Sequence, residues 1–258
     1  MRIVVLVKSV PDTNGYRKLE LETGLTDRAA SDAVLDEISE RAVEASLTLA
    51  AKEADSTVEL LSMAQEEAQT LIRRGLAMGA DTATQIVDPA LKGADTNLTA
   101  EVLAAALKRK EFDVIIAGNQ STDGSGGVIP SMLAELLDLP ALTELTSVDF
   151  ESGALKATRT TESGTYELRA DLPAIISVTE AFPDGRFPNF KGIMAAKKKP
   201  FEVLSLAELG VNAEDFSVPH VIMTAVSERP PREAGVKIVD EGDAAAQLAD
   251  FLVKNRLA

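Results

Sequence analysis

A stretch of small and polar residues in the middle of the chain has the composition of a phosphate-binding loop. It follows the apolar run at 114–117 and precedes an amphipathic segment that is expected to begin near Ile129. Glycines lack a Cβ, so several of them close together allow backbone N–H groups to converge on an anion. The glycines of this stretch are Gly118, Gly124, Gly126 and Gly127. A helix N-terminus after them, with Pro130 in its first turn, would add free N–H donors and a partial positive charge.

The chemistry that this loop indicates is the binding of a phosphate, not its transfer. The loop matches neither GxxxxGK[ST] nor GxGxxG, and it contains no lysine for a γ-phosphate. A monophosphate or an unreactive nucleotide therefore fits better than an ATP undergoing hydrolysis. The same spacing also fits a glycine-rich connection that only turns the chain.

Other residues that could act as catalysts are few. The chain has one histidine, His220, and no cysteine, which argues against a Ser-His-Asp triad, thiolate chemistry and a His- or Cys-ligated metal site. Asp36 and Glu37 open an expected helix, where carboxylates interact well with the helix dipole. Capping is therefore favoured over catalysis for this pair.

The composition limits the partners and the location. The formal net charge of −15 should repel nucleic acid and anionic membrane, although it is also simply what keeps a protein soluble. No apolar run reaches the roughly 18–20 residues that span a bilayer, so no direct membrane insertion is expected. The N-terminal run MRIVVLVKSV is too short for a signal peptide and contains Lys8. We therefore expect no nucleic-acid partner and a cytoplasmic location.

Short apolar runs alternate with amphipathic segments up to the loop. The expected strands span 3–7, 57–62, 82–87 and 114–117, and the expected helices span 36–53, 66–78 and 96–110. This alternation predicts an α/β fold with a doubly wound, mostly parallel sheet and helices on both faces. In such a sheet the loop lies at the carboxyl end of a strand, where ligands bind.

The pattern changes after Pro140. Thr-rich segments at 156–161 and 165–169 predict a β-hairpin, residues 174–178 predict another buried strand, and 181–200 reads as irregular. A short helix is expected near 204–209 and a final one at 243–255. We therefore predict a core domain at 1–210, which includes the hairpin and the segment 181–200, and an extended C-terminal arm at 211–258.

A second candidate site lies in the segment 181–200. Phe187 and Phe190 precede the basic run Lys197–Lys199 in a Pro-rich stretch that is expected to be exposed. Apolar anchors beside a charged rim are typical of docking surfaces, whereas a basic run alone is usually a solvated end.

Several motifs in order resemble the electron transfer flavoprotein β subunit family. They are VLVKSVPDT, AVLDEISERAVEAS, GLAMGAD, GNQSTDGSGG, RTTESGTYELRADLPAIISVT and FPNFKGIMAAKKKP. The resemblance spans nearly the whole chain, and its motifs are specific in combination. It implies an adenine-nucleotide α-hydrolase-like fold and a heterodimer with an α subunit, to which the C-terminal arm would attach.

The resemblance also implies function. AMP would be bound in this subunit and FAD mainly on the α subunit; acyl-CoA dehydrogenases and other dehydrogenases would donate electrons, and a quinone oxidoreductase would accept them. An electron carrier of this kind needs no catalytic residue of its own. The implied cofactor-binding residues are Leu6, Val34, Leu35, Asp36, Met63, Asn119, Gln120, Ser121, Thr122, Asp123, Gly124, Ser125, Gly126, Gly127, Val128 and Ile129.

The implied docking residues belong to the same segment as the exposed-looking phenylalanines. They are Arg186, Phe187, Phe190, Ile193, Met194, Lys197 and Lys198. Phe190 stands where the family has a leucine that anchors in a pocket of the dehydrogenase. The partner's pocket is therefore expected to differ.

Three other functions fit parts of the same sequence. Some members of the family hold a second FAD in place of AMP and bifurcate electrons. A stand-alone adenine-nucleotide binding module would need only the loop and the sheet. A nucleotide-using ligase or hydrolase fits the fold alone.

Overall fold

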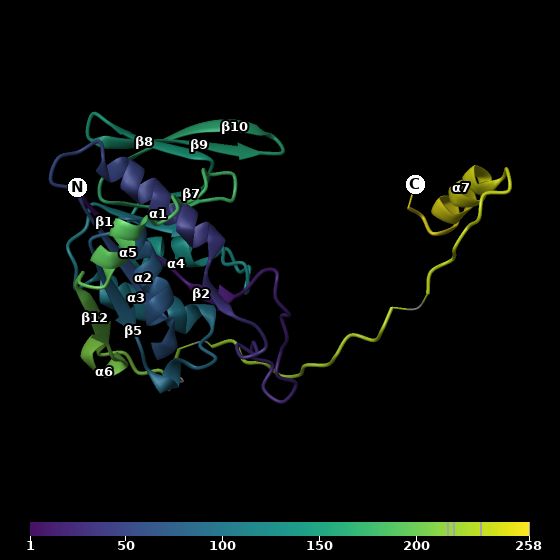
Figure 1. The fold of residues 1–258 in the computed structure, drawn as a ribbon, viewed down its shortest axis with the longest axis horizontal. Helices are drawn as coiled ribbons and strands as arrows, with labels where there is room; N and C mark the ends of the chain where they lie inside the picture. Colours follow the sequence, from purple (N-terminus) through teal and green to yellow (C-terminus); the bar gives the residue numbers. More distant parts are fainter. Residues whose placement is uncertain (216, 219, 233, 258) are drawn as a thin grey trace. The chain divides into compact units, whose positions relative to one another are not determined.

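The computed structural model describes residues 1–215, 217–218, 220–232 and 234–257 and divides the chain into two compact units (Figure 1). The first unit spans Met1–Ala225 and the second spans Val226–Ala258. All elements named below belong to the first unit, except the helix α7.

A seven-stranded parallel sheet forms the centre of the first unit, in the order β12-β5-β4-β1-β6-β11-β7. Its inner strands are largely buried, and most of their buried residues are Val, Ile, Leu and Ala, as is typical of a parallel sheet covered on both faces. The strands are β1 Arg2–Leu6, β4 Thr57–Met63, β5 Thr82–Ile86, β6 Val114–Gly118, β7 Ala141–Leu145, β11 Ala174–Val178 and β12 Phe201–Leu204. The predicted α/β fold with a mostly parallel sheet is confirmed.

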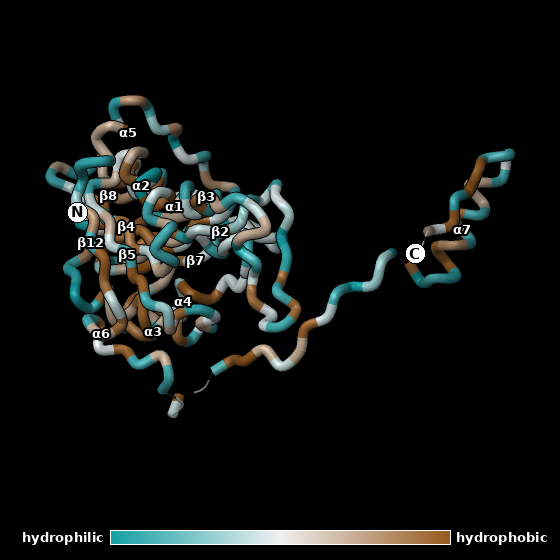
Figure 2. The backbone as a smooth tube through the Cα atoms, turned by 60° about the horizontal axis from the view of Figure 1, so that its bottom comes forward, coloured by the Kyte–Doolittle hydropathy of each residue, from teal (hydrophilic) through white to brown (hydrophobic). Residues whose placement is uncertain are grey.

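Helices cover both faces of this sheet, and each pair packs on a separate apolar cluster. The helices α1 (Glu37–Ala50) and α2 (Gln69–Met78) bury their apolar stripes on one face. The helices α3 (Thr96–Leu107) and α4 (Ile129–Leu137) do so on the other. Figure 2 shows the apolar chain of the strands enclosed between these layers. Short turns of 3₁₀ helix, η1 Glu66–Ala68 and η2 Pro89–Leu91, precede α2 and α3.

The sequence of crossovers creates a switch point in the sheet. From β1 the chain runs outward to β4 and β5, and it then returns to place β6 on the other side of β1. In open α/β sheets, ligands bind outside the carboxyl ends of the strands where the order reverses in this way. The connection after β6 is the predicted phosphate loop, so the fold puts it at this position.

Two smaller antiparallel sheets complete the first unit. The predicted hairpin is present, but it belongs to a three-stranded sheet of β8 (Ser147–Glu151), β9 (Ala154–Thr161) and β10 (Gly164–Asp171). The strands β2 (Ser9–Pro11) and β3 (Ala33–Leu35) pair with each other, and the long loop at 12–32 connects them. The sequence pattern did not predict β2, β3, β7, β8 or β12.

The sequence predicted that the segment 181–200 is irregular, and this is wrong for its second half. It contains the helix α5 (Phe190–Ala196), which packs on α2, and the helix α6 (Leu206–Leu209) follows β12 and packs on α3. The second unit contains α7 (Ala244–Lys254), close to the predicted helix. Within the described residues, no helix has the length and apolar character to cross a membrane.

Candidate functional site

The predicted cofactor loop lies where the carboxyl ends of β1 and β6 meet. Asn119 follows β6, and the loop ends at the first turn of α4, where Ile129 and Pro130 begin the helix as predicted. Lys8, two residues beyond β1, reaches across to the loop. The site therefore combines a glycine-rich loop, a helix N-terminus and a lysine that follows the neighbouring strand β1.

Asp36 joins the first helix to this loop. It is fully buried, and its Oδ1 accepts hydrogen bonds from the amides of Ile38 (3.0 Å) and Ser39 (3.1 Å), so it is the N-cap of α1. Its Oδ2 accepts from the amide (2.7 Å) and the hydroxyl (2.8 Å) of Thr122. The predicted capping role is confirmed, and the same carboxylate also fixes the loop.

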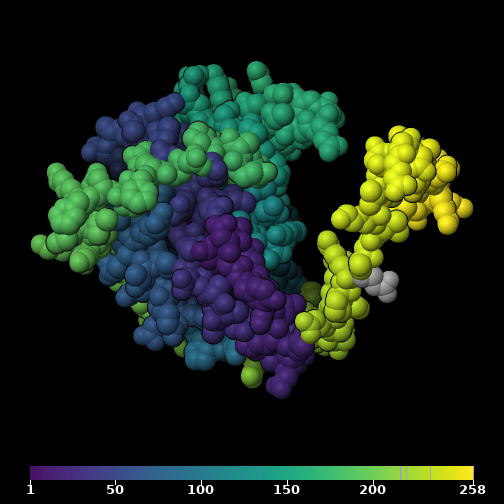
Figure 3. Space-filling model, turned by 45° about the vertical axis from the view of Figure 1, so that its right-hand side comes forward, coloured from purple at the N-terminus to yellow at the C-terminus, as the bar shows by residue number. Residues whose placement is uncertain are grey.

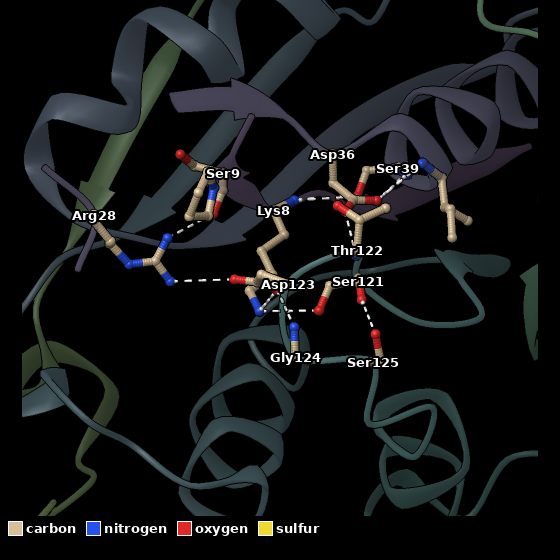
Figure 4. A network of polar contacts seen from close by, with 12 residues as sticks. Lys8, Ser9, Arg28, Asp36, Ser39, Ser121, Thr122, Asp123, Gly124 and Ser125 are labelled. Carbon is tan, nitrogen blue, oxygen red and sulfur yellow. Dashed lines mark hydrogen bonds and ion pairs between the residues drawn. The ribbon is translucent and has the colours of Figure 1, made fainter. Parts of the chain in front are cut away.

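The carboxylate of Asp123, within the loop, is contacted by two cationic side chains, Lys8 and Arg28 (Figure 4). Its Oδ1 lies 2.7 Å from Lys8 Nζ and accepts the Gly124 amide at 2.6 Å, and its Oδ2 lies 3.5 Å from an Arg28 nitrogen. Burial alone would raise the pKa of Asp123, but the charge and hydrogen bond of Lys8 outweigh it and hold that pKa below its ordinary value. Lys8 also donates to Ser121 Oγ at 3.1 Å. The carboxylate is thus kept ionised between two cations.

Arginines from the long loop between β2 and β3 contact the same residues. Arg17 donates to the carbonyl oxygen of Thr122, to its Oγ1 at 3.3 Å and to the carbonyl of Pro11 at 2.9 Å. Arg28 donates to the carbonyl of Ser9 at 3.2 Å. Sequence reasoning missed Lys8, Arg17 and Arg28 as site residues. The residues that they contact in the 121–123 segment are about 100 positions away in the sequence, and the two arginines belong to a loop without periodicity.

The glycines of the loop fall into two classes. A Cβ on Gly118 would lie 2.8 Å from Ile38 Cγ2, so this glycine lets α1 approach β6. A Cβ on Gly124 or Gly126 would meet nothing closer than 3.6 Å, so packing does not require glycine there. Gly127 has φ +64°, a left-handed conformation that glycine adopts without strain. Open space beside Gly124 and Gly126 is what an external ligand would need.

A buried polar atom next to the loop also has no hydrogen-bond partner. Asn119 is 8% exposed; its amide nitrogen donates to Glu144 Oε2 at 3.0 Å, whereas its Oδ1 is unsatisfied among the described residues. Leaving such an acceptor unpaired costs about 1–3 kcal/mol. A ligand donor such as a hydroxyl or amino group would satisfy it.

The other predicted cofactor residues are distributed over two places. Leu6 belongs to the apolar cluster beneath α3 and α4, and Met63 and Ile129 pack against that cluster. Gln120 and Ser125 are exposed in the loop, as is Val128. By contrast, Val34 and Leu35 line a shallow pocket with residues of α1 and α2. The structure thus joins Asp36 to the loop, places Leu6, Met63 and Ile129 at the apolar cluster, and places Val34 and Leu35 at a separate pocket.

The predicted docking segment is held firmly at its start. The amide and side chain of Arg186 donate to the carboxylate of Glu44 on α1, with the two side-chain contacts both 2.8 Å. The hydrogen bond from Arg186 lowers the pKa of Glu44, and the same pair raises the pKa of Arg186. Arg186 is therefore a fixing residue of this segment.

The helix α5 is held just as closely. Asn189 caps it by accepting the Gly192 amide at 2.8 Å, and a Cβ on Gly192 would lie 2.4 Å from the Ala77 carbonyl of α2. Lys199 donates to three carbonyls at the end of α2, those of Leu76, Gly79 and Ala80. Glycine is thus needed where α5 meets α2, and a lysine fixes the far end of the segment.

The large side chains of the segment point away from this anchored base. Phe187 is 84% and Phe190 79% exposed, and Ile193 and Met194 are also exposed. Lys197 and Lys198 are exposed beside them. Figure 3 shows the segment in green on the surface, next to the blue of α1 and α2. The structure therefore presents an apolar group with a basic edge on a rigid support.

Comparison with known proteins identifies the family. The model of the electron transfer flavoprotein domain matches residues 23–209. This chain belongs to the electron transfer flavoprotein β subunit family. The resemblance that the sequence motifs carried is thereby confirmed.

Curated relatives match over nearly the full length. The chain is 45% identical over 262 aligned residues to electron transfer flavoprotein subunit beta of Mycobacterium bovis, with 99% of this chain and 98% of that protein covered. It is 31% identical over 253 residues to the protein of the same name from Bacillus subtilis, with 98% and 96% covered. It is also 30% identical over 257 residues to the caffeyl-CoA reductase–Etf complex subunit CarD of Acetobacterium woodii, with 98% and 97% covered.

Proposed function

We propose that this chain is the β subunit of a heterodimeric electron transfer flavoprotein with AMP bound structurally in the loop at 119–129. FAD is then held mainly by the α subunit. In the cytoplasm, the complex accepts electrons from acyl-CoA dehydrogenases of fatty acid β-oxidation and from other dehydrogenases. It passes them to a quinone oxidoreductase and so to the respiratory chain. The arm at 211–258 packs on the α subunit.

The geometry of the loop carries this proposal. Its backbone lies at the switch point of the sheet, the space at Gly124 and Gly126 is open, and Asn119 Oδ1 lacks a partner among the described residues. The phosphate would lie against the loop and the N-terminus of α4. Leu6, Met63 and Ile129 belong to or pack against the apolar cluster beneath α3 and α4, and they would supply apolar surface for the adenosine.

The docking segment would be the surface that binds the dehydrogenases from which electrons come. Phe187 and Phe190 would insert into a dehydrogenase, with Lys197 and Lys198 at the rim. Short-lived redox complexes typically bury less than about 1,200 Å² in total, which a helix of seven residues with large apolar side chains can supply. The chain needs no nucleophile or general base for this role because the flavin carries the electrons.

A second candidate is a β subunit that holds a second FAD in the loop and bifurcates electrons. The ADP portion of FAD offers the same adenosine and phosphate groups to the loop as AMP does. The match to a subunit of a caffeyl-CoA reductase–Etf complex favours keeping this candidate, although its 30% identity is below the 45% to the mycobacterial subunit.

Mass spectrometry of the nucleotides released from the purified complex distinguishes these functions. One AMP and one FAD per heterodimer is the expected result. Two FAD and no AMP would establish the bifurcating type instead. A stable, flavin-free monomer that never co-purifies with an α subunit would overturn both and favour a stand-alone nucleotide-binding module. Turnover of ATP by the purified chain would point to a ligase or hydrolase.

A further inference from the structure

We propose that Lys8 and Arg28 are phosphate-binding residues of the nucleotide site, held in position by the buried carboxylate of Asp123, and that Arg17 keeps the 12–32 loop closed on the site. The proposal rests on the proposed nucleotide binding and goes beyond it. It adds side-chain cations from two other parts of the chain to the backbone donors of the glycine loop.

Phosphate binding by Lys8 and Arg28 requires that both cations remain accessible while Asp123, which holds them, is buried. The Asp123 side chain is 7% exposed, whereas those of Lys8 and Arg28 are 41% and 37% exposed. The carboxylate is therefore the buried support, and both cations have a free side toward solvent. Arg28 lies 3.5 Å from Asp123, beyond a good hydrogen bond, so it can turn to an incoming anion at little cost.

The charges around the loop do not balance. Lys8, Arg17 and Arg28 supply three positive charges, and the carboxylates in contact with this network, Asp36 and Asp123, supply two negative ones. Among the described residues, Arg17 forms no ion pair and donates only to oxygens of Thr122 and Pro11. A surplus cation in a chain of net charge −15 marks a place for an anion, and a phosphate monoester carries about −1.5 to −2 at neutral pH.

The position of Lys8 relative to the loop supports the same conclusion. A Cβ on Gly124 would lie 3.8 Å from Lys8 Nζ, so the ammonium group stands directly over the open part of the loop. Figure 4 shows Lys8 and Arg28 approaching Asp123 from different elements, with Ser121 and Gly124 beside them. Two cations from different parts of the chain thus approach the same part of the loop.

The 12–32 loop covers this region through its arginines. Arg17 binds Thr122 and Arg28 binds Ser9 and Asp123, so both ends of the loop are attached to the site. Between them, Leu25 packs against Gly93 near the start of α3. Release of the arginines would free a loop whose residues from 13 to 23 are all exposed.

A purely structural alternative makes a different prediction. If Lys8 and Arg28 serve only to neutralise Asp123, then removing the charge of Asp123 should remove the need for them. If they bind phosphate, they should still be needed without that charge. A double-mutant cycle between Arg28 and Asp123 separates the two.

The experiment measures equilibrium binding of AMP and adenosine to the full-length chain by titration calorimetry. The variants are Arg28→Gln, Asp123→Asn and the double variant, with Lys8→Gln as a second cation variant. Arg2→Gln is the matched control, since Arg2 pairs with Glu111 and Asp113 at the opposite end of β1. We expect Arg28→Gln and Lys8→Gln to weaken AMP binding about 10- to 100-fold, as for a lost hydrogen bond to a charged group. Adenosine binding and the control should be unchanged.

The same loss on Arg28→Gln in the Asp123→Asn background would support the proposal. Full recovery in that background would overturn it, because Arg28 would then only neutralise Asp123. Equal affinity of the wild-type chain for AMP and adenosine would also overturn it while leaving the nucleotide assignment intact. If the wild-type chain binds FAD and not AMP, the AMP assignment fails, and a 10- to 100-fold loss of FAD affinity in Arg28→Gln would still support the phosphate role.

Discussion

Replacement of Asp36 by Asn tests whether one carboxylate joins the first helix to the nucleotide loop. The substitution keeps size and polarity, and Asn is as good an N-cap as Asp. It does, however, exchange one acceptor oxygen for an NH₂ group. If the amide oxygen continues to cap α1, the NH₂ group faces the amide of Thr122, and that part-buried N–H loses its partner.

The structure sets the size of the effect. An unpaired buried N–H costs about 1–3 kcal/mol, so Asp36→Asn should lower the free energy of unfolding by that amount. Asp36→Ala should cost about 1 kcal/mol more, because it also removes the cap from the amides of Ile38 and Ser39. Asp27→Asn is the control, because among the described residues the Asp27 side chain accepts only the exposed amide of Ala29, and this substitution should change stability by a few tenths of a kcal/mol.

Two measurements on the full-length chain check this reasoning. Urea denaturation at one fixed protein concentration gives the free energy of unfolding for each variant. Hydrogen exchange then locates the effect, since the loss of the Thr122 contact should speed exchange at 119–128 far more than in the sheet. Asp36→Asn with wild-type stability and unchanged exchange in the loop would refute the idea that Asp36 fixes the loop.

Three further predictions concern the docking role of Phe190, the space beside Gly126 in the loop, and the pH dependence of the Glu44–Arg186 pair. Phe190→Ala should weaken electron transfer from an acyl-CoA dehydrogenase about tenfold or more, as for the loss of an interface anchor, with FAD content unchanged; stopped-flow kinetics that match the wild type would contradict the docking role. In Gly126→Val the added Cβ would have only Thr96 within 4 Å, at 3.9 Å, so the fold should tolerate the substitution while bound AMP is lost, together with about 2.7 kcal/mol of stabilisation at a ligand concentration of 100 Kd; retention of AMP on mass spectrometry would show that the space is not the ligand's. The hydrogen bond to Arg186 lowers the pKa of Glu44 below 4.5, so the pair stabilises the fold above about pH 4.5 and ceases to do so as the pH falls through the folded-state pKa. Glu44→Gln should therefore cost up to about 1 kcal/mol at neutral pH, reduced by solvent screening, and nothing in acid, and a pH-independent difference in urea denaturation would rule this out.

Periodicity predicted the long elements of the sheet and its covering helices. The runs that become β1, β6 and β11 are almost entirely apolar and buried, whereas β4 and β5 include polar residues but still lie between amphipathic helices. Helices such as α1 and α2 carry wide apolar stripes, and Gly79 with φ +147° ends α2 as predicted. These features are local in sequence, which is why they could be recognised without a structure.

The elements that were missed are short or lie at edges. The strand β12 pairs with β5 on one side only, and two of its four residues are exposed, so it lacks an apolar pattern. In α5 the apolar side chains of Phe190, Ile193 and Met194 face solvent, which reverses the rule that apolar residues of a helix point inward.

The candidate site was predictable in part. The glycine loop and the cap at Asp36 are sequence patterns with a local mechanism. The contact between Lys8 and Asp123 joins residues 115 positions apart, and no local rule contains it. The arginines of the 12–32 loop lie in a segment where only the three-dimensional arrangement distinguishes a ligand-facing side chain from a solvated one.

The anchoring of the proposed docking segment has a consequence for how its specificity can change over evolutionary time. Arg186, Gly192 and Lys199 hold the backbone, whereas Phe187 and Phe190 contribute almost nothing to the buried interior. Mutations at the exposed positions are therefore almost free of stability cost, and they can alter partner choice one substitution at a time. A gene library randomised at 187, 190, 193 and 194 should yield mostly folded proteins, whereas one randomised at 186, 192 and 199 should not.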